Sequence, residues 1–157
     1  MPIKEYEKEG FVTLSHDIEL LEDLNTPYPH IIAKNGSDIV GYALVTIPEK
    51  ASSIPLLQAT VEELIGIEYH QTKVLNLKYF IMGQVCIHKS YRGQEIFQGL
   101  YHKMKAEMKS DFEMIITEIT TDNKRSMRAH EKVGFEILKI HKGISTDWAL
   151  VGLNLRK

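Results

Sequence analysis

The sequence predicts a single mixed α/β domain that spans residues 1–157. An apolar run from Tyr79 to His88 has the composition of a strand. A short loop joins it to a helix-like segment that starts at Ile96, and a second apolar run, Met114 to Ile119, follows. A strand–helix–strand unit of this length favours two parallel neighbouring strands. The length is that of one ordinary domain, which buries a core without disulfides or metal ions.

The amino-terminal half is predicted to contain a helix, a hairpin and a second helix. Apolar residues recur at helical spacing behind Ser15, which is a plausible cap. Asn35-Gly36 lies between two apolar runs, and this dipeptide is typical of a hairpin loop. The predicted elements are a helix over Asp17–Leu24, antiparallel strands over His30–Lys34 and Ile39–Ile47, a helix over Pro55–Glu68 and a connection over His70–Lys78.

The carboxy-terminal half continues the alternation of strands and helices. Gly83 inside the central strand predicts a β-bulge or a close backbone approach. Asn123 is a cap residue for a later helix, and Gly134 supplies the left-handed conformation at its end. The predicted elements are strand Tyr79–His88, an amphipathic helix from Ile96, strand Met114–Ile119, helix Asn123–Val133, and strands Phe135–Ile140 and Asp147–Leu155.

Composition excludes several classes of protein. The net charge is −2 and 25% of residues are charged, which gives no general attraction to nucleic acid. No run of about 18 apolar residues exists, and the first residues are too polar for a secretory signal, so we expect a cytoplasmic protein with no membrane partner. Cys86 is the single cysteine, and the seven histidines lack metal-ligand spacing, which predicts no metal site.

The segment Tyr91–Leu100 joins the central strand directly to a helix, and a phosphate can bind at such a junction. The first turn of a helix has N–H groups without intrahelical partners, and the positive end of the helix dipole adds to the attraction. The alternative is an ordinary connection in which Arg92 is solvated. A second segment, Asn123–Phe135, favours the phosphate interpretation when both are considered.

Together the two segments resemble the GNAT superfamily of acyl-CoA-dependent N-acyltransferases. Its pyrophosphate loop reads Arg/Gln-x-x-Gly-x-Gly/Ala, and its later helix often ends Tyr/His-Glu-Lys-x-Gly-Phe, which residues 130–135 match. In the loop Arg92 and Gly93 are present, but Glu95 and Phe97 stand where the family usually has small residues. The Glu95 carboxylate must therefore turn away from a pyrophosphate, and the Phe97 ring must point into the core. The resemblance implies a twisted, mostly antiparallel sheet whose two central parallel strands splay apart.

The resemblance also implies how acetyl-CoA is bound. The pantetheine arm would contact backbone groups along the edge of the central strand, the pyrophosphate would lie on the loop, and the later helix would meet the arm and the adenosine phosphates. The predicted residues are Val85, Cys86 and Ile87 on the strand, Arg92, Gly93, Gln94, Glu95, Ile96 and Phe97 in the loop, and Asn123 and Arg125, with Lys124 and Arg128, on the helix. The alternatives are an ordinary buried strand, Asn123 as a helix cap only, and a solvated basic face.

Two residues are candidates for proton transfer. Glu118 is a carboxylate in an otherwise apolar strand, and some relatives place a base at this position. His130 stands where the family commonly has a tyrosine that protonates the leaving thiolate, and imidazolium is a competent acid near neutral pH. The alternatives are a Glu118 at the solvated end of a strand and a structural histidine on a helix.

The resemblance implies transfer of an acetyl group from acetyl-CoA to a primary amine, by direct attack in a ternary complex and without a metal. The partners would be acetyl-CoA and a small-molecule or peptide amine, with homodimer formation left open. The competing hypotheses are a non-catalytic acyl-CoA-binding or regulatory module, because of Glu95 and Phe97, and a purely structural or interaction domain. The sequence carries no motif that identifies the amine.

Overall fold

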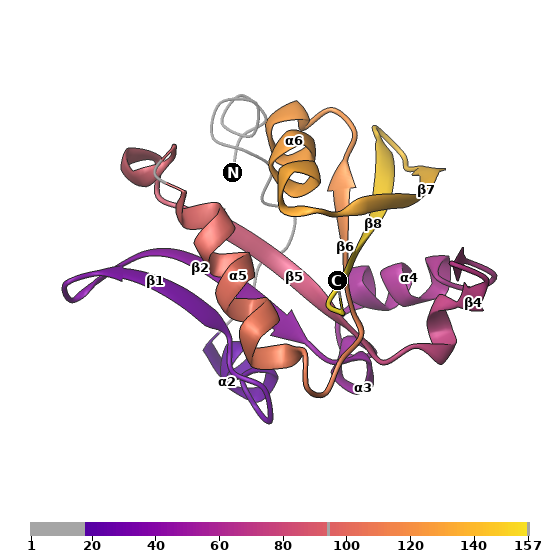
Figure 1. The fold of residues 1–157 in the computed structure, drawn as a ribbon, viewed down its shortest axis with the longest axis horizontal. Coiled ribbons are helices and arrows are strands. Elements are labelled where there is room, and N and C mark those ends of the chain that lie inside the picture. Colours follow the sequence, from indigo (N-terminus) through magenta and orange to yellow (C-terminus); the bar gives the residue numbers. More distant parts are fainter. Residues whose placement is uncertain (1–17, 94, 157) are drawn as a thin grey trace.

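The structure, a computed structural model, describes residues 18–93 and 95–156. A six-stranded sheet in the order β1-β2-β5-β6-β8-β7 has helices on both faces (Figure 1). This confirms the predicted mixed α/β class. The elements are α2 (Ile18–Leu24), β1 (Ile31–Asn35), β2 (Asp38–Thr46), α3 (Pro48–Ala51), α4 (Pro55–Glu63), β3 (Glu68–Tyr69), β4 (Thr72–Lys73), the 3-10 helix η1 (Val74–Asn76), β5 (Tyr79–Ile87), the 3-10 helix η2 (Lys89–Tyr91), α5 (Ile96–Met108), β6 (Met114–Thr120), α6 (Lys124–Val133), β7 (Glu136–Lys142) and β8 (Asp147–Asn154).

The predicted parallel pair is β5 and β6, and it is short. Residues 79–81 pair with residues 114–116, although both strands continue for several residues beyond. The other pairings in the sheet are antiparallel. At the point of divergence the Thr117 hydroxyl donates to the Met82 carbonyl at 2.8 Å, so one side chain satisfies the first carbonyl after the ladder ends. The two strands therefore form a fork that opens toward their carboxyl ends.

The predicted irregularity at Gly83 is a β-bulge. Val45 pairs with Met82, but Ala43 pairs with Val85, so β5 has one more residue than β2 over this stretch. A side chain at Gly83 would meet Leu57 at 3.5 Å, in ordinary van der Waals contact. The bulge turns Val85 toward the main core, and it lies where β5 leaves β6.

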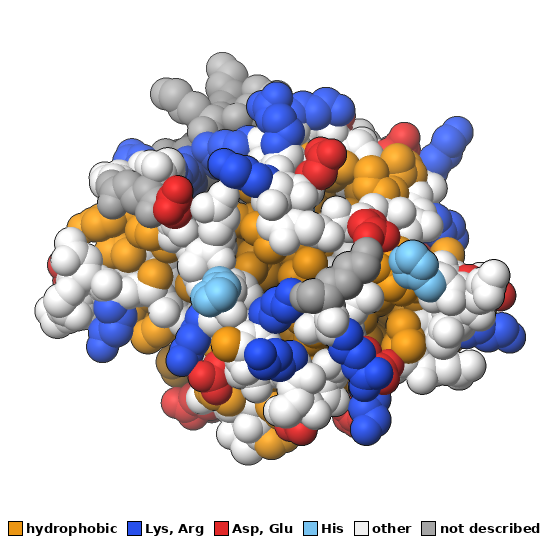
Figure 2. All heavy atoms as spheres, viewed as in Figure 1, with side chains coloured by type: hydrophobic (Ala, Val, Ile, Leu, Met, Phe, Trp, Pro, Cys, Tyr) orange, Lys and Arg blue, Asp and Glu red, His pale blue; other side chains and the backbone are white. Residues whose placement is uncertain are grey.

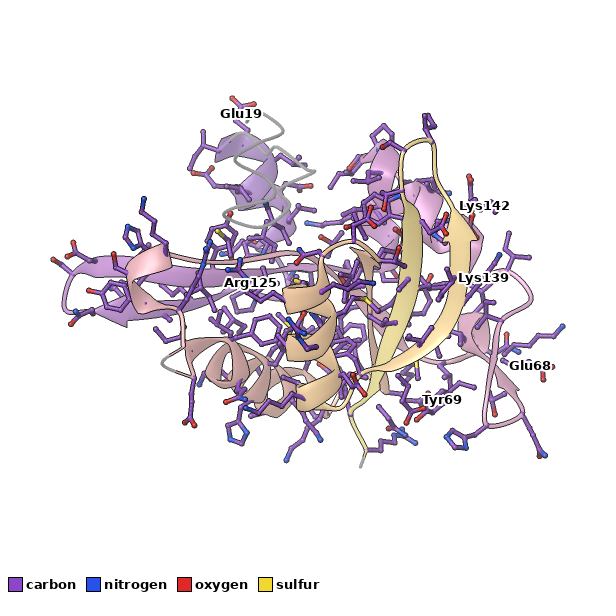
Figure 3. The ribbon with its side chains drawn as sticks, turned by 90° about the horizontal axis from the view of Figure 1, so that it is seen from above. Glu19, Glu68, Tyr69, Arg125, Lys139 and Lys142 are labelled. Atoms are coloured by element: carbon purple, nitrogen blue, oxygen red, sulfur yellow. The ribbon has the colours of Figure 1, made fainter. Side chains whose placement is uncertain are left out.

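Two hydrophobic clusters cover the two faces of the sheet. One packs α5 against the sheet through Tyr101 and Met104, and the other packs α2, α3 and α4 through residues such as Leu24 and Leu57. Figure 3, which looks at the molecule from above, shows these two helical layers on opposite sides of the strands. Side chains in the fork can therefore contact elements from either helical layer.

The second predicted helix is shorter than expected and has a neighbour. It ends at Glu63 rather than Glu68, because Gly66 has φ +81°, and Pro48 begins the additional short helix α3. The hairpin β3–β4 begins at Glu68, the last residue of the predicted helix, and continues into the predicted connection; its turn residues His70 and Gln71 have φ of 48° and 70°. Non-glycine residues seldom adopt positive φ, so no local signal marked this turn.

The ends of α6 agree with the sequence. Asn123 Oδ1 accepts from Ser126 N at 3.1 Å, and Gly134 has φ +120° after the last turn. The predicted cap Ser15 and the predicted first helical residue Asp17 lie outside the described residues, and the described part of this helix is Ile18–Leu24. Within residues 18–93 and 95–156, no helix combines the length and apolar character needed to cross a membrane.

Candidate functional site

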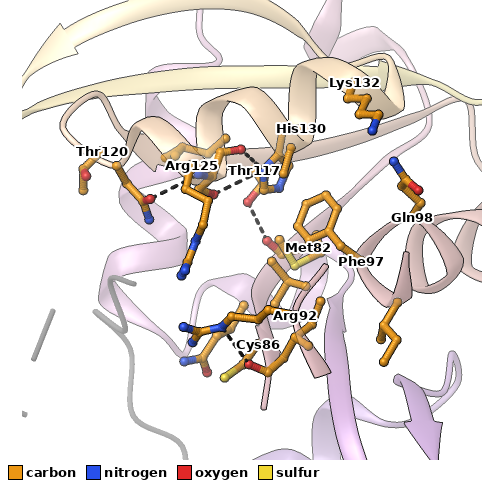
Figure 4. Close-up of a pocket in the computed structure, with 18 of the residues that line it drawn as sticks. Met82, Cys86, Arg92, Phe97, Gln98, Thr117, Thr120, Arg125, His130 and Lys132 are labelled. Atoms are coloured by element: carbon orange, nitrogen blue, oxygen red, sulfur yellow. Dashed lines mark hydrogen bonds between the residues drawn. The ribbon is translucent and has the colours of Figure 1, made fainter. Parts of the chain in front are cut away.

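A cavity of about 400 Å³ lies where β5 and β6 diverge. Its walls are residues 82–87 of β5, residues 117–120 of β6, the loop and first turn of α5, and one side of α6. The cavity occupies the fork of the sheet. Hydrogen bonding between β5 and β6 ends there, and the separated strands leave space between them (Figure 4). The volume lies in the range of small-molecule and cofactor sites.

The structure brings the predicted site residues together. Apart from Lys124 and Arg128, every one that it describes lines this cavity, whereas Gln94 lies outside the described residues. Of the three cations at the start of α6, only Arg125 lines it, and Lys124 and Arg128 are exposed elsewhere on the helix. Figure 2 shows Lys and Arg side chains gathered over α6. Lys124 and Arg128 therefore lie outside the cavity wall, and a contact between them and the adenosine phosphates stays a prediction.

The edge of β5 that faces β6 is available over residues 83–87. No described strand pairs with it there, and the side chains of Val85, Cys86 and Ile87 are half-buried. At the far end of the edge, Arg92 Nε donates to the Ile87 carbonyl at 3.3 Å. Backbone N–H and C=O groups along such an edge can pair with an extended amide-containing ligand in the manner of an added strand.

The loop before α5 contains two residues with left-handed backbone conformation that line the cavity. Gly93 and Glu95 have φ of 80° and 62°, and Glu95 is the residue that precedes the helix. A side chain at Gly41 would lie 3.3 Å from Ile96, so this glycine allows α5 to start close to β2. Loops with left-handed residues before a helix orient successive N–H groups toward an anion.

The Phe97 ring points toward the core, as required for a loop that approaches a ligand. It packs 5.1 Å from the Tyr101 ring and 4.9 Å from the His130 ring, measured between centroids. The Glu95 side chain is exposed. Both residues line the cavity, Phe97 with a ring packed on core aromatics and Glu95 with an exposed side chain.

Two guanidinium groups lie beside the loop. Burial lowers the pKa of Arg125, and the charge of Arg92 lowers it further, so the two cations lie within electrostatic reach of each other. Both line the cavity, and Figure 4 shows them on the same side of it. Two like charges held close together, beside N–H groups at a helix start, form a site that suits a phosphate.

Glu118 is a largely buried carboxylate in the wall formed by β6. Its side chain is 12% exposed, and His141 Nε2 lies 3.1 Å from its Oε1. Burial raises the pKa of Glu118 above its usual value, while the charge and hydrogen bond of His141 oppose this rise. A carboxyl with a raised pKa in a cavity is suited to accept a proton near neutral pH.

His130 lines the cavity on the other face, where it is 2% exposed. Its Nδ1 lies 2.8 Å from the Ser126 carbonyl, which can only accept, so Nδ1 carries the proton. Its Nε2 lies 2.8 Å from the Tyr101 hydroxyl and therefore accepts from it. Burial lowers the pKa of His130 to about 4, so the ring is neutral at pH 7. The imidazolium expected from the sequence is not the resting form.

The two candidate residues approach the cavity from opposite faces of the sheet. Glu118 contacts His141 on the face covered by α4, because Leu150, its partner on β8, belongs to that hydrophobic cluster. His130 packs on Tyr101 and Phe135 in the cluster of the other face. Two reactants that enter from the two faces of the sheet would therefore meet in the fork.

Several polar groups of the cavity have no sequence signal. Thr120 Oγ1 is buried in its wall and has no hydrogen-bond partner among the described residues. Trp148 of β8 also lines it. His141, which the sequence placed in a connection, is a β7 residue that reaches Glu118 across β8. Such contacts depend on strand order, which no local pattern reveals.

Among the residues that the structure describes, no three His, Cys, Asp or Glu side chains are grouped closely enough to hold a metal ion.

Known proteins share this architecture. The chain is similar in structure to smu.2055 from Streptococcus mutans (TM-score 0.64, 13% identity, 92% of this chain and 81% of that one). It is also similar to yncA from Salmonella typhimurium, a putative acetyltransferase in complex with its cofactor acetyl-CoA (TM-score 0.61, 16% identity, 88% and 70%). A third is the ribosomal-protein-S18-alanine N-acetyltransferase of Escherichia coli (TM-score 0.59, 11% identity, 96% and 85%).

No curated protein sequence matches the chain significantly. A family model does match it, over residues 3–135, and this model describes the acetyltransferase (GNAT) family. The matched range contains the fork, the loop before α5 and the whole of α6. The chain therefore belongs to the GNAT acetyltransferase family.

Proposed function

We propose that the protein transfers an acetyl group from acetyl-CoA to a primary amine of a small molecule or peptide, by direct attack in a ternary complex. The observation that carries this proposal is the cavity in the fork, which combines an unpaired strand edge, a cationic loop and a buried carboxylate. Homodimer formation, a cytoplasmic location and independence from metal ions stay predictions.

The residues of the cavity fit coenzyme A as an acyl donor. The unpaired edge over Val85–Ile87 would pair with the amides of the pantetheine arm, and the loop N–H groups with Arg92 and Arg125 would hold the phosphates. Asn123, which already caps α6, lies in the same wall. Acetyl-CoA then supplies an activated thioester carbonyl in the fork, between the two faces of the sheet.

Glu118 would act as the base. A primary amine is protonated at pH 7, and its nitrogen attacks only after that proton is lost. The Glu118 carboxylate would take the proton directly or through one water molecule. The nitrogen then forms its bond to the carbonyl carbon, the carbon–sulfur bond breaks, and the electron pair leaves with the thiolate. N–H groups of the β5 edge would stabilise the charge that develops on the carbonyl oxygen.

The environment of His130 disfavours a role as proton donor to the thiolate. Charging a ring with pKa about 4 at pH 7 costs about 4 kcal/mol. General acid help is worth about 10²- to 10⁴-fold, or about 3–5 kcal/mol, so the cost removes most of the benefit. We propose instead that neutral His130 shapes the cavity wall, and that the departing thiolate takes the nitrogen's second proton, directly or through a water molecule.

The first prediction concerns His130. His130→Phe is expected to lower kcat by less than about 10-fold and to leave the pH profile between pH 6 and 8 unchanged in shape, because the ring does not titrate there. It should also lower stability by about 1–3 kcal/mol, since the Tyr101 hydroxyl loses its acceptor. A fall of about 10²-fold or more, with one limb of the profile lost, would restore the acid role. Tyr101→Phe is the control for the loss of the buried hydrogen bond alone.

The second prediction tests the function itself. Acetyl-CoA at about 100 times its Kd is expected to stabilise the protein by about 2.7 kcal/mol, which raises Tm by about 5–10 °C for a domain of this size. Release of free thiol should then be measured with a panel of amino acids, polyamines and amino-terminal peptides. A Tm that acetyl-CoA leaves unchanged would refute the cofactor site. Binding without transfer to any amine would favour the non-catalytic acyl-CoA-binding module.

A further inference from the structure

His141 lies between two carboxylates and has no role in the mechanism described so far. Its Nε2 is 3.1 Å from Oε1 of Glu118, and its Nδ1 is 3.7 Å from Oε1 of Glu63. The second oxygen of Glu63 accepts from Lys139 Nζ at 2.8 Å. The His141 side chain is 18% exposed. A chain of polar contacts therefore runs from the cavity wall to the edge strand β7, where Figure 3 shows Lys139.

Three strands and one helix build this chain of contacts. β8 lies between β6 and β7, and its Leu150 stands opposite both Glu118 and Lys139. Residues paired across strands point to the same face of a sheet, and His141 lies two residues beyond Lys139 on the same side. That face is covered by α4, which supplies Glu63. The contacts follow from the strand order and are not accidental surface pairs.

We propose that His141 is the positioning residue of the Glu118 base. A carboxylate oxygen can only accept, so the imidazole donates Nε2–H to Oε1 of Glu118 and holds this carboxylate in the cavity wall. Glu63, held by Lys139, lies against Nδ1 and keeps the ring in place. This inference rests on the proposed function, because it assigns a partner to the base of that reaction.

The charges around His141 fit this role. The groups that face it are Glu118 on β6, Glu63 on α4 and Lys139 on β7, while β8 presents the uncharged Leu150 and Trp148. Two carboxylates and one ammonium favour a donated proton from the imidazole. Burial and, to a smaller extent, the charge of Glu63 raise the pKa of Glu118, whereas the charge and hydrogen bond of His141 and a hydrogen bond from Thr60 lower it, so His141 favours the ionised base. Without His141, the pKa of Glu118 is expected to rise further, because less would oppose the effect of burial.

The third prediction measures this effect on the protein without ligands. The pKa of the Glu118 carboxyl is followed by its ¹³C chemical shift, with Glu118→Gln used to assign the signal. His141→Phe is expected to raise that pKa by about 1 pH unit, because a hydrogen bond to the charged form is lost. His141→Gln, whose amide N–H can still donate, should restore most of the original value. Glu63→Gln should give a smaller change, since it loosens the outer support of the ring but also removes a negative charge that raises the pKa of Glu118.

Kinetics then connect the contact to the reaction. In His141→Phe the acidic limb of kcat/KM should move upward with the pKa of Glu118, while KM for acetyl-CoA stays constant. The control is His102→Phe, which removes an exposed histidine of α5 and should change neither quantity. A His141→Phe titration that coincides with that of the unmodified protein would overturn the proposal. Failure to transfer acetyl to any amine would count against the proposed function instead, since the titration requires no turnover.

Discussion

Glu118→Gln is expected to lower kcat/KM at pH 7 by about 10²- to 10⁴-fold, the usual worth of a general base. Glutamine has nearly the same shape and still accepts from His141 through its amide oxygen, so the wall of the cavity is preserved. The loss should shrink as pH rises, because a growing fraction of the amine is already deprotonated in solution. Initial rates from about pH 6 to pH 10, at saturating acetyl-CoA, measure both effects.

The sign of the pH dependence follows from the carboxyl itself. Burial raises the pKa of Glu118, and only the ionised form accepts a proton, so kcat/KM falls as pH drops through that raised value. Glu118→Gln should lack this limb. Glu62→Gln is a matched control, because it removes an exposed carboxylate from the same helical layer without touching the cavity. Full activity in Glu118→Gln would mean that orientation alone accounts for the rate.

The parts of the fold that the sequence predicted are those with local causes. The bulge at Gly83, the cap at Asn123 and the positive φ at Gly134 each depend on one residue type in one conformation. The order of strand, loop and helix around Arg92 is also local, and it placed most of the cavity wall correctly.

The parts that the sequence missed depend on distant pairings or on burial. His141 meets Glu118 only because β8 inserts between β6 and β7. The neutral state of His130 follows from a buried ring whose two nitrogens bind the Ser126 carbonyl and the Tyr101 hydroxyl. A residue type in a motif gives the position of a side chain, but its protonation is set by neighbours that come together only in the folded chain.

The double variant Arg92→Ala/Arg125→Ala is expected to raise the Kd for acetyl-CoA by about 10²-fold at low salt. Each charge-assisted hydrogen bond to a phosphate is worth about 1.5–3 kcal/mol, and the lower value applies at the partly exposed mouth of the cavity. Two such contacts give about 3 kcal/mol, and each 1.4 kcal/mol is tenfold in Kd. Isothermal titration calorimetry at about 0.01 M and 1 M salt measures the effect, which should be smaller at high salt because of screening.

A matched control distinguishes direct contact between a cation and a phosphate of acetyl-CoA from a general effect of positive charge on α6. Lys124→Ala/Arg128→Ala removes two cations from the same helix, but neither residue lines the cavity, so Kd should rise by less than about threefold. Arg125→Ala alone leaves the bond from Arg92 to the Ile87 carbonyl intact and should account for about a tenfold loss. Equal losses in the two double variants would show that the α6 cations act only as a diffuse field. A loss confined to Arg92→Ala/Arg125→Ala would place the phosphates beside the loop that precedes α5.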